Sequence, residues 1–304
     1  MKNFFIILLL LFTCCEKNIT IELPDVEDKI VIQGHIEQGL PPYVILTRST
    51  PYFDDVGLST FDSLFVHDAL VVVSDGINDF TLTELCAADL DTALLPFISE
   101  AIGIPAENLI NLQYCIYTNF SVFGIVGKTY KLTVTAGDKT YSSTTEIPQL
   151  VPLDSIWFEL FGTSDSSGLI WANLSDPPAL GNAYRWFAKR QGQDNNFIAP
   201  LGSAFEDKFF NGKSISFAYD RGHHPSEEDN QEASHLYKTG DTIIVKFCTI
   251  DKGHFDFWRS FDTEMISNGN PFAAPASIKT NIEGGALGVW GGYGVSYDTT
   301  VATK

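Results

Sequence analysis

Short runs of β-branched and aromatic residues, separated by turn residues, recur along this chain and constrain its fold more than any other feature. The runs at 30–36 and 43–47 flank the turn Gly39-Leu40-Pro41-Pro42. Runs of this length bounded by glycine and proline predict antiparallel strands. Gly137-Asp138-Lys139 predicts a three-residue hairpin loop. Further strands are expected at 69–74, 80–85, 130–136, 140–146, 154–161, 169–173, 183–190, 214–219 and 241–250. We therefore expect a mainly β fold of two immunoglobulin-like or β-sandwich domains.

Two segments depart from this pattern. Between residues 87 and 111, apolar residues recur at a spacing closer to 3.6 than to 2, which predicts a helical insertion in the first domain, with Pro105 suited to a second helix start. Between residues 252 and 267, large apolar side chains also recur at helical spacing. This second segment predicts one amphipathic helix in the second domain.

The N-terminus has the pattern of an export signal. Lys2 is followed by an apolar run, Phe4 to Phe12, that is too short to span a bilayer. The run ends in Thr13-Cys14-Cys15, which resembles a bacterial lipobox. By that resemblance residues 1–14 are removed and Cys15 carries the lipid, because several acyl chains anchor a protein stably. Cys14 as the modified residue, and a plain secretory signal, are the alternatives.

Length and linker composition suggest the domain organisation. Removing 14 of the 304 residues leaves 290, which is more than one core usually organises. We expect a lipidated tether at 15–28, an N-terminal β-sandwich domain at 29–150 and a C-terminal β-rich domain at 151–304. The segment 147–154, with two prolines, is interpreted as the interdomain linker.

Composition excludes several classes of function. The chain is 44% hydrophobic and 13% aromatic, so it has the means to bury a large core. Its formal charge of −19 repels nucleic acid and anionic lipid headgroups. We therefore expect no nucleic-acid partner. We also expect the lipid, and not a basic surface patch, to anchor the protein to the membrane.

Export permits disulfides, and two cysteines bracket the helical insertion. Cys86 and Cys115 are the natural pair, with two buried free thiols as the alternative. Cys248 lies in an apolar run and is expected in the core.

Signatures of catalysis are scarce, and we expect neither an enzyme nor a bound metal or cofactor. His35-Ile36-Glu37 matches half of a zinc deaminase motif, but the Pro-Cys-x-x-Cys half is absent. The run of histidines and acids at 223–229 lacks the spacing of a closed metal site, and we interpret it as a solvated loop. Asp54-Asp55 supplies too few oxygens for calcium.

Two further segments invite interpretation. Four aromatic residues in a long polar loop either contact a partner or ligand or form a local core beneath the loop: Tyr52, Phe53, Phe61 and Phe65. The glycine-rich stretch 284–294 lacks the Lys and Ser/Thr of a phosphate-binding loop, and it predicts a strand with close backbone approaches around Val289 and Trp290.

Three stretches together resemble a known family. They are the lipobox with Cys15-Glu16-Lys17, the segment from Gly127 through Tyr141 to Pro148, and the tail with Pro271-Phe272, 280–285 and Leu287-Gly288-Val289-Trp290. In these stretches the chain resembles the Bacteroidota lipoproteins grouped as domain of unknown function 4249.

The resemblance implies an outer-membrane lipoprotein, lipid-anchored and facing the cell surface, that associates with a TonB-dependent β-barrel transporter. It brings no catalytic residues, and the expected role is a non-enzymatic accessory or ligand-capture subunit. The alternative is a stand-alone surface adhesin or glycan-binding module. The sequence leaves the ligand open.

Overall fold

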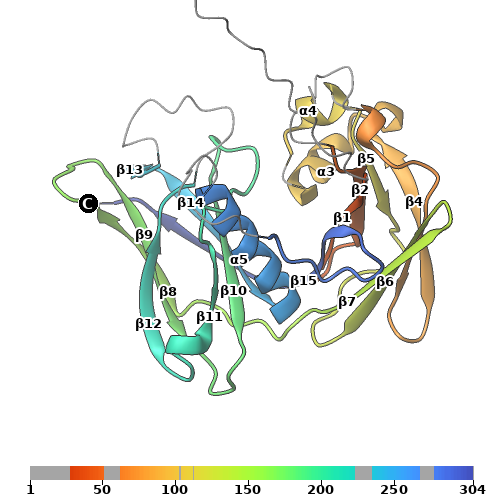
Figure 1. The fold of residues 1–304 in the computed structure, drawn as a ribbon. Helices are drawn as coiled ribbons and strands as arrows, with labels where there is room; N and C mark the ends of the chain where they lie inside the picture. Colours follow the sequence, from red (N-terminus) through yellow and green to blue (C-terminus); the bar gives the residue numbers. More distant parts are fainter. Residues whose placement is uncertain are drawn as a thin grey trace, which may run out of the picture.

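The protein is mainly β, as the sequence predicts, and Figure 1 shows its N-terminal half beside its C-terminal half. The structure is a computed structural model that describes residues 28–50, 62–102, 104–111, 113–222, 235–267 and 277–303. In the N-terminal half the strands are β1 (Ile30–Glu37), β2 (Tyr43–Arg48), β3 (Leu70–Ser74), β4 (Asp79–Cys86), β5 (Cys115–Thr118), β6 (Thr129–Ala136) and β7 (Lys139–Glu146). In the C-terminal half they are β8 (Ser155–Leu160), β9 (Ser167–Ser175), β10 (Ala183–Arg190), β11 (Ala204–Glu206), β12 (Ser214–Tyr219), β13 (Tyr237–Lys238), β14 (Thr242–Ile250) and β15 (Leu287–Val301).

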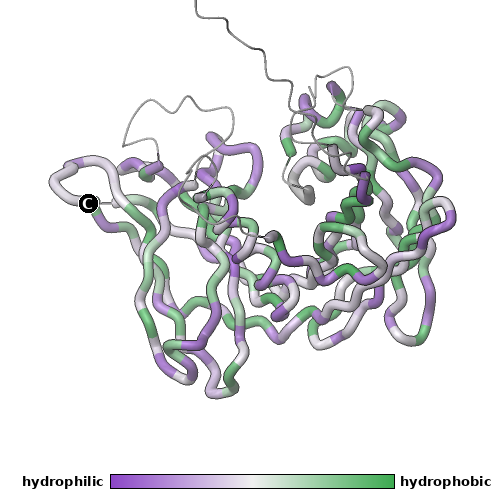
Figure 2. Tube along the Cα trace, in the orientation of Figure 1, coloured by the Kyte–Doolittle hydropathy of each residue, from purple (hydrophilic) through white to green (hydrophobic). Residues whose placement is uncertain are grey.

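One sheet of 11 strands runs through both halves. Its order is β11-β10-β14-β15-β1-β2-β5-β4-β3-β6-β7, and a second sheet of four strands is formed by β12, β9 and β13 with β8 paired to β9. Alternating side chains are buried along many of these strands, and Figure 2 shows hydrophobic residues concentrated in the strands. Facing sheets with alternating burial are consistent with a β-sandwich.

The long strand β15 joins the halves. It pairs antiparallel with β14 and parallel with β1, whereas the expected pairing was antiparallel throughout. Trp290, in the stretch that carried the family resemblance, is fully buried and donates its indole N–H to the carbonyl of Tyr130 at 3.1 Å. The amide of Asn281 hydrogen-bonds both backbone polar groups of Trp290. Residues from the chain end thus complete the core of the N-terminal half, a cluster that contains Ile282, Ala286 and Trp290.

The helical insertion is present between β4 and β5. A 3-10 turn, η3 (Ala87–Asp89), precedes α3 (Leu95–Ile102) and α4 (Ala106–Asn111). Pro96 occupies the first turn of α3, where a missing N–H costs little. The insertion buries Leu95 and Leu109 in a separate core against Tyr43 and Ile45, which point away from the main N-terminal core. One strand, β2, therefore serves two cores on its two faces.

The predicted amphipathic helix is α5 (Lys252–Ser267), which packs on the sheet across β10, β11 and β15. Phe255 enters a core with Cys248, Ile250 and Val295. Gly291 on β15 permits the close approach of α5, since a Cβ at this position would sit 2.3 Å from the His254 ring. The buried Cys248 is in the core, as expected.

One local expectation changes, and one is confirmed. The β6–β7 hairpin has two loop residues, Gly137 and Asp138, because Ala136 pairs with Lys139. Gly137 supplies the positive φ of 58° that this tighter turn requires. From Leu287 onward the glycine-rich stretch belongs to the strand β15, as predicted, and Gly292 and Gly294 admit the backbone of Glu146 and Pro148. The expected linker thus lies against β15.

Candidate functional site

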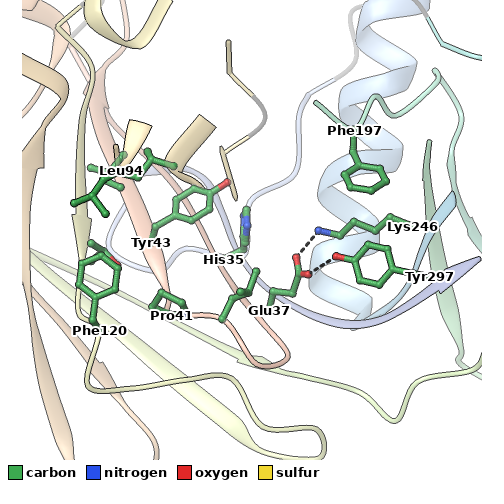
Figure 3. Close-up of a pocket in the computed structure, with 13 residues that line it drawn as sticks. His35, Glu37, Pro41, Tyr43, Leu94, Phe120, Phe197, Lys246 and Tyr297 are labelled. Atoms are coloured by element: carbon green, nitrogen blue, oxygen red, sulfur yellow. Dashed lines mark hydrogen bonds and ion pairs between the residues drawn. The ribbon is translucent and has the colours of Figure 1, made fainter. Parts of the chain in front are cut away.

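A pocket of about 540 Å³ lies on the sheet where the two halves meet. We call it the central pocket, and Figure 3 shows residues of the N-terminal half on one side and Phe197, Lys246 and Tyr297 on the other. Its volume is within the range of small-molecule sites. The lining residues are His35, Glu37, Leu40, Pro41, Tyr43, Leu94, Ile98, Ile116, Thr118, Phe120, Phe197, Lys246 and Tyr297.

The N-terminal wall is apolar. The insertion contributes Leu94 and Ile98, and β5 contributes Ile116. Phe120, in the loop after β5, is 61% exposed at this wall. Large side chains that stay exposed next to a cavity are a common mark of a binding surface, since burial elsewhere would have been favourable.

The opposite wall carries the one ion pair among the described lining residues. Lys246 on β14 donates a hydrogen bond to Oε2 of Glu37 at the end of β1. The hydroxyl of Tyr297 on β15 donates to Oε1 of the same carboxylate at 3.2 Å. Burial by itself lowers the pKa of Lys246, but the charge of Glu37 overcomes this and raises it above its ordinary value. Lys246 therefore stays charged.

The floor of the pocket is uncharged at neutral pH. Burial, and then the positive charge of Lys246, holds the pKa of His35 well below its ordinary value. Burial raises the pKa of Tyr43 well above its ordinary value. The two rings meet edge to face at 4.0 Å between centroids. Burial keeps both rings uncharged, and the contact between them holds both rings in place.

The loop after β10 reaches from the C-terminal half to the insertion. Asn196 is buried and accepts a hydrogen bond from the buried hydroxyl of Ser99 on α3, at 3.3 Å. The neighbouring Phe197 ring lines the pocket, with Lys189 Nζ 4.5 Å from its centroid. The base of this loop is held by Arg190 and Asp194, whose side chains pair at 2.6 Å. The two halves thus touch through Ser99 and Asn196 as well as through the sheet.

The structure places some of the site residues predicted from the sequence, and others lie outside the residues it describes. Cys86 and Cys115 form a disulfide at the base of the insertion. Phe65 is buried against Tyr114 and belongs to the local core, the alternative weighed for the aromatic loop. Several predicted positions lie outside the described residues: Cys14, Cys15, Tyr52, Phe53, Phe61, Asp54, Asp55 and 223–229.

The central pocket itself was not predicted. In the sequence, His35 and Glu37 form half of a deaminase motif, and Lys246 is one position of the apolar run 241–250. The available signal was a single charged residue in each of two strongly apolar strands, Glu37 in β1 and Lys246 in β14.

One grouping of metal-binding residue types occurs in the described part of the chain. One potential ligand atom from each of His67, Glu84, Cys86 and Cys115 lies within 4.8 Å of the others. Both sulfurs are consumed by the disulfide, and a disulfide sulfur is no thiolate ligand. This group does not fit a metal ion.

Comparison with known proteins assigns the chain to a family. A family model for the domain of unknown function (DUF4249) matches residues 16–299. The chain belongs to the DUF4249 family. No curated protein matches it.

Among solved structures, the chain is similar to a "Cycloalternan-degrading enzyme from Trueperella pyogenes in complex with cycloalternan". The two share 9% identity with a TM-score of 0.23, and the match covers 88% of this chain and 34% of that one. This DUF4249 protein therefore spans about a third of that structure's length, and so low a similarity bears on neither fold nor function. Within its described residues, no helix has the length and apolarity needed to cross a membrane.

Proposed function

We propose that this DUF4249 protein is a non-enzymatic, lipid-anchored subunit that captures a small ligand in the central pocket at the outer membrane and acts with a TonB-dependent transporter. The observation that carries the proposal is the pocket itself. It has a mainly apolar lining with a small polar end, which is the usual composition of a small-molecule site.

The chemistry of the polar end favours binding over catalysis. Lys246 and Tyr297 both donate to Glu37, so the carboxylate is held by two donors. A general base must reach the proton it abstracts, and a carboxylate already held in this way is poorly placed to do so.

The capture function is tested with the neutral fluorophore N-phenyl-1-naphthylamine. The mature chain from residue 15, carrying Cys15→Ser to keep it in solution, is expected to bind the probe saturably. Phe120→Ala weakens binding, because Phe120 lines the pocket. Phe209→Ala is the matched control, since Phe209 is 87% exposed and is not among the lining residues. Equal effects of the two substitutions would refute capture in this pocket.

The anchor and the partner have separate tests. Cys15→Ser is expected to move the protein from the membrane fraction to the soluble fraction, because loss of the acyl chains removes the anchor. Protease treatment of intact cells is expected to digest a surface-facing protein. Solubilisation in mild detergent and pull-down through a C-terminal tag is expected to recover a β-barrel transporter. Repeated recovery of the lipoprotein alone would argue against that partner.

A stand-alone surface adhesin or glycan-binding module is the second candidate. Two rings on opposite sides of the pocket favour it, since Phe120 and Tyr297 are both more than half exposed and sugar faces stack on exposed rings. Binding of the soluble chain to a glycan array in the absence of any transporter would support this alternative.

A further inference from the structure

The polar end of the central pocket contains one cation and one anion that neutralise each other. Glu37 is 4% exposed, and the side chain of Lys246 beside it is 16% exposed. Tyr297 adds a hydroxyl dipole directed at the same carboxylate. The pair therefore presents hydrogen-bonding groups to the pocket with no net charge.

Nothing else in the described lining disturbs this neutrality. His35 and Tyr43 are held uncharged by burial, and the hydroxyl of Thr118 donates to the carbonyl of Pro42 at 2.7 Å. The remaining lining is aliphatic or aromatic. Lys189 lies beside Phe197 and is not among the lining residues.

An ionic ligand gains little in such a site. A carboxylate that approaches Lys246 also approaches Glu37, and an ammonium that approaches Glu37 also approaches Lys246. The attraction and the repulsion nearly cancel, while the desolvation of the ligand's charge is not offset. A hydroxyl or carbonyl group loses much less hydration and still hydrogen-bonds to the pair.

We propose that the Glu37–Lys246 pair makes the central pocket selective for neutral, largely apolar molecules that carry a hydroxyl or carbonyl group, and against organic anions and cations of the same size. The proposal rests on the capture function above and adds the chemical class of the ligand. Glu37 and Lys246 are specificity-determining residues in this view.

The experiment displaces N-phenyl-1-naphthylamine from the mature chain carrying Cys15→Ser, using 1-octanol, octanoate and octylammonium as competitors. These share one alkyl chain and differ in the charge of the head group. The solution contains 0.15 M salt, where the Debye length of about 8 Å screens the acidic surface. Octanol is expected to displace the probe at a concentration at least about tenfold lower than either ion, a difference of about 1.4 kcal/mol.

Charge variants separate the pair from the field of the whole protein. Glu37→Gln leaves Lys246 unbalanced, so octanoate becomes the preferred ion. Lys246→Met leaves Glu37 unbalanced and gives the preference to octylammonium. The whole-chain charge of −19 changes by only one unit in each case, so a surface effect would not reverse the preference. The double variant Glu37→Gln/Lys246→Met removes both charges and is expected to lose the ion preference that each single variant gains, because no unbalanced charge remains in the pocket.

The outcomes are distinct. Saturable probe binding with equal displacement by all three competitors, or with an ion preferred by the wild-type protein, overturns the selectivity and leaves the capture function standing. Absence of saturable probe binding overturns both. Single variants that keep the wild-type order of the three competitors overturn the role of the pair. If one single variant fails to fold, the other still decides, because each is expected to prefer a different ion.

Discussion

Lys246 and Glu37 meet side chain to side chain although 209 positions separate them in the sequence. They lie on β14 and β1, and β15 separates these two strands in the sheet. Tyr297 on β15 completes the group by donating to Glu37. This polar group therefore forms only when all three strands are in register, and it couples the assembly of the sheet to the construction of the pocket.

The first prediction concerns the stability of this pair. Lys246→Met leaves a carboxylate that is 4% exposed without its cation, and we expect the free energy of unfolding to fall by about 3 kcal/mol. The double variant Glu37→Gln/Lys246→Met is expected to come within about 1 kcal/mol of the wild-type protein, because no unpaired charge remains buried. Urea unfolding followed by tryptophan fluorescence measures both. A double variant less stable than Lys246→Met would contradict this explanation.

The second prediction is a pH dependence caused by His254. Burial, and then the charge of Arg185, lowers the pKa of His254 to about 3 in the folded protein, whereas an unfolded histidine titrates near 6.5. The folded state therefore resists protonation. Its stability is complete above pH 6.5 and is lost as the pH falls from 6.5 towards 3, by about 1.4 kcal/mol per pH unit. The lowered pKa of His35 acts in the same direction.

Urea unfolding between pH 7.5 and pH 5 tests this dependence. His254→Leu changes the packing under α5 by an amount that does not vary with pH. The slope of unfolding free energy against pH below 6.5 is expected to decrease by the contribution of one histidine. An unchanged slope would show that His254 takes up its proton over the same pH range in the folded and the unfolded protein.

The third prediction concerns the disulfide at the base of the insertion. Cys86 and Cys115 are 29 positions apart, and a crosslink closing a loop of this size stabilises by about 3 kcal/mol through the unfolded state. Replacing both with serine is expected to lower the free energy of unfolding by that amount. The wild-type protein under reducing conditions should match the variant, and adding reductant to the variant should change nothing. A loss in the reduced wild-type protein alone would point to another cause.

The fourth prediction tests the parallel pairing of β1 with β15. Gly288 has a φ of +105°, and a Cβ there would sit 2.0 Å from the carbonyl oxygen of Ile32. Gly285 also has a positive φ, of +89°, but its Cβ would meet nothing within 4 Å. Gly285→Ala is expected to cost about 1 kcal/mol from backbone strain.

Gly288→Ala has the same kind of strain and must also displace β1. We expect it to cost at least about 2 kcal/mol more than Gly285→Ala in urea unfolding. Equal costs would mean that the two strands do not approach as closely as described.

Local patterns predicted most of the strands and every long helix in the described chain. Alternating or continuous apolar runs located β1 to β4, β6 to β10, β12 and β14, and helical spacing located α3 and α5. The strands that were missed, β5, β11 and β13, have four residues or fewer, and the glycine-rich β15 was predicted only around Val289 and Trp290, although it runs from Leu287 to Val301. Short strands show too little alternation to be detected, and glycine has no side chain to alternate.

The strand-rich fold, the helical insertion with its cysteine pair, and the acidic character of the protein can be read from the sequence, because each depends on residues near one another in the chain or on composition alone. The central pocket, in contrast, exists only in the folded chain. Folding brings β1, β5, β14, β15 and the loop after β10 together, and those contacts arise from strand pairing across more than 200 positions. No local pattern encodes such pairing, since each strand presents the same backbone hydrogen-bonding groups to any neighbour.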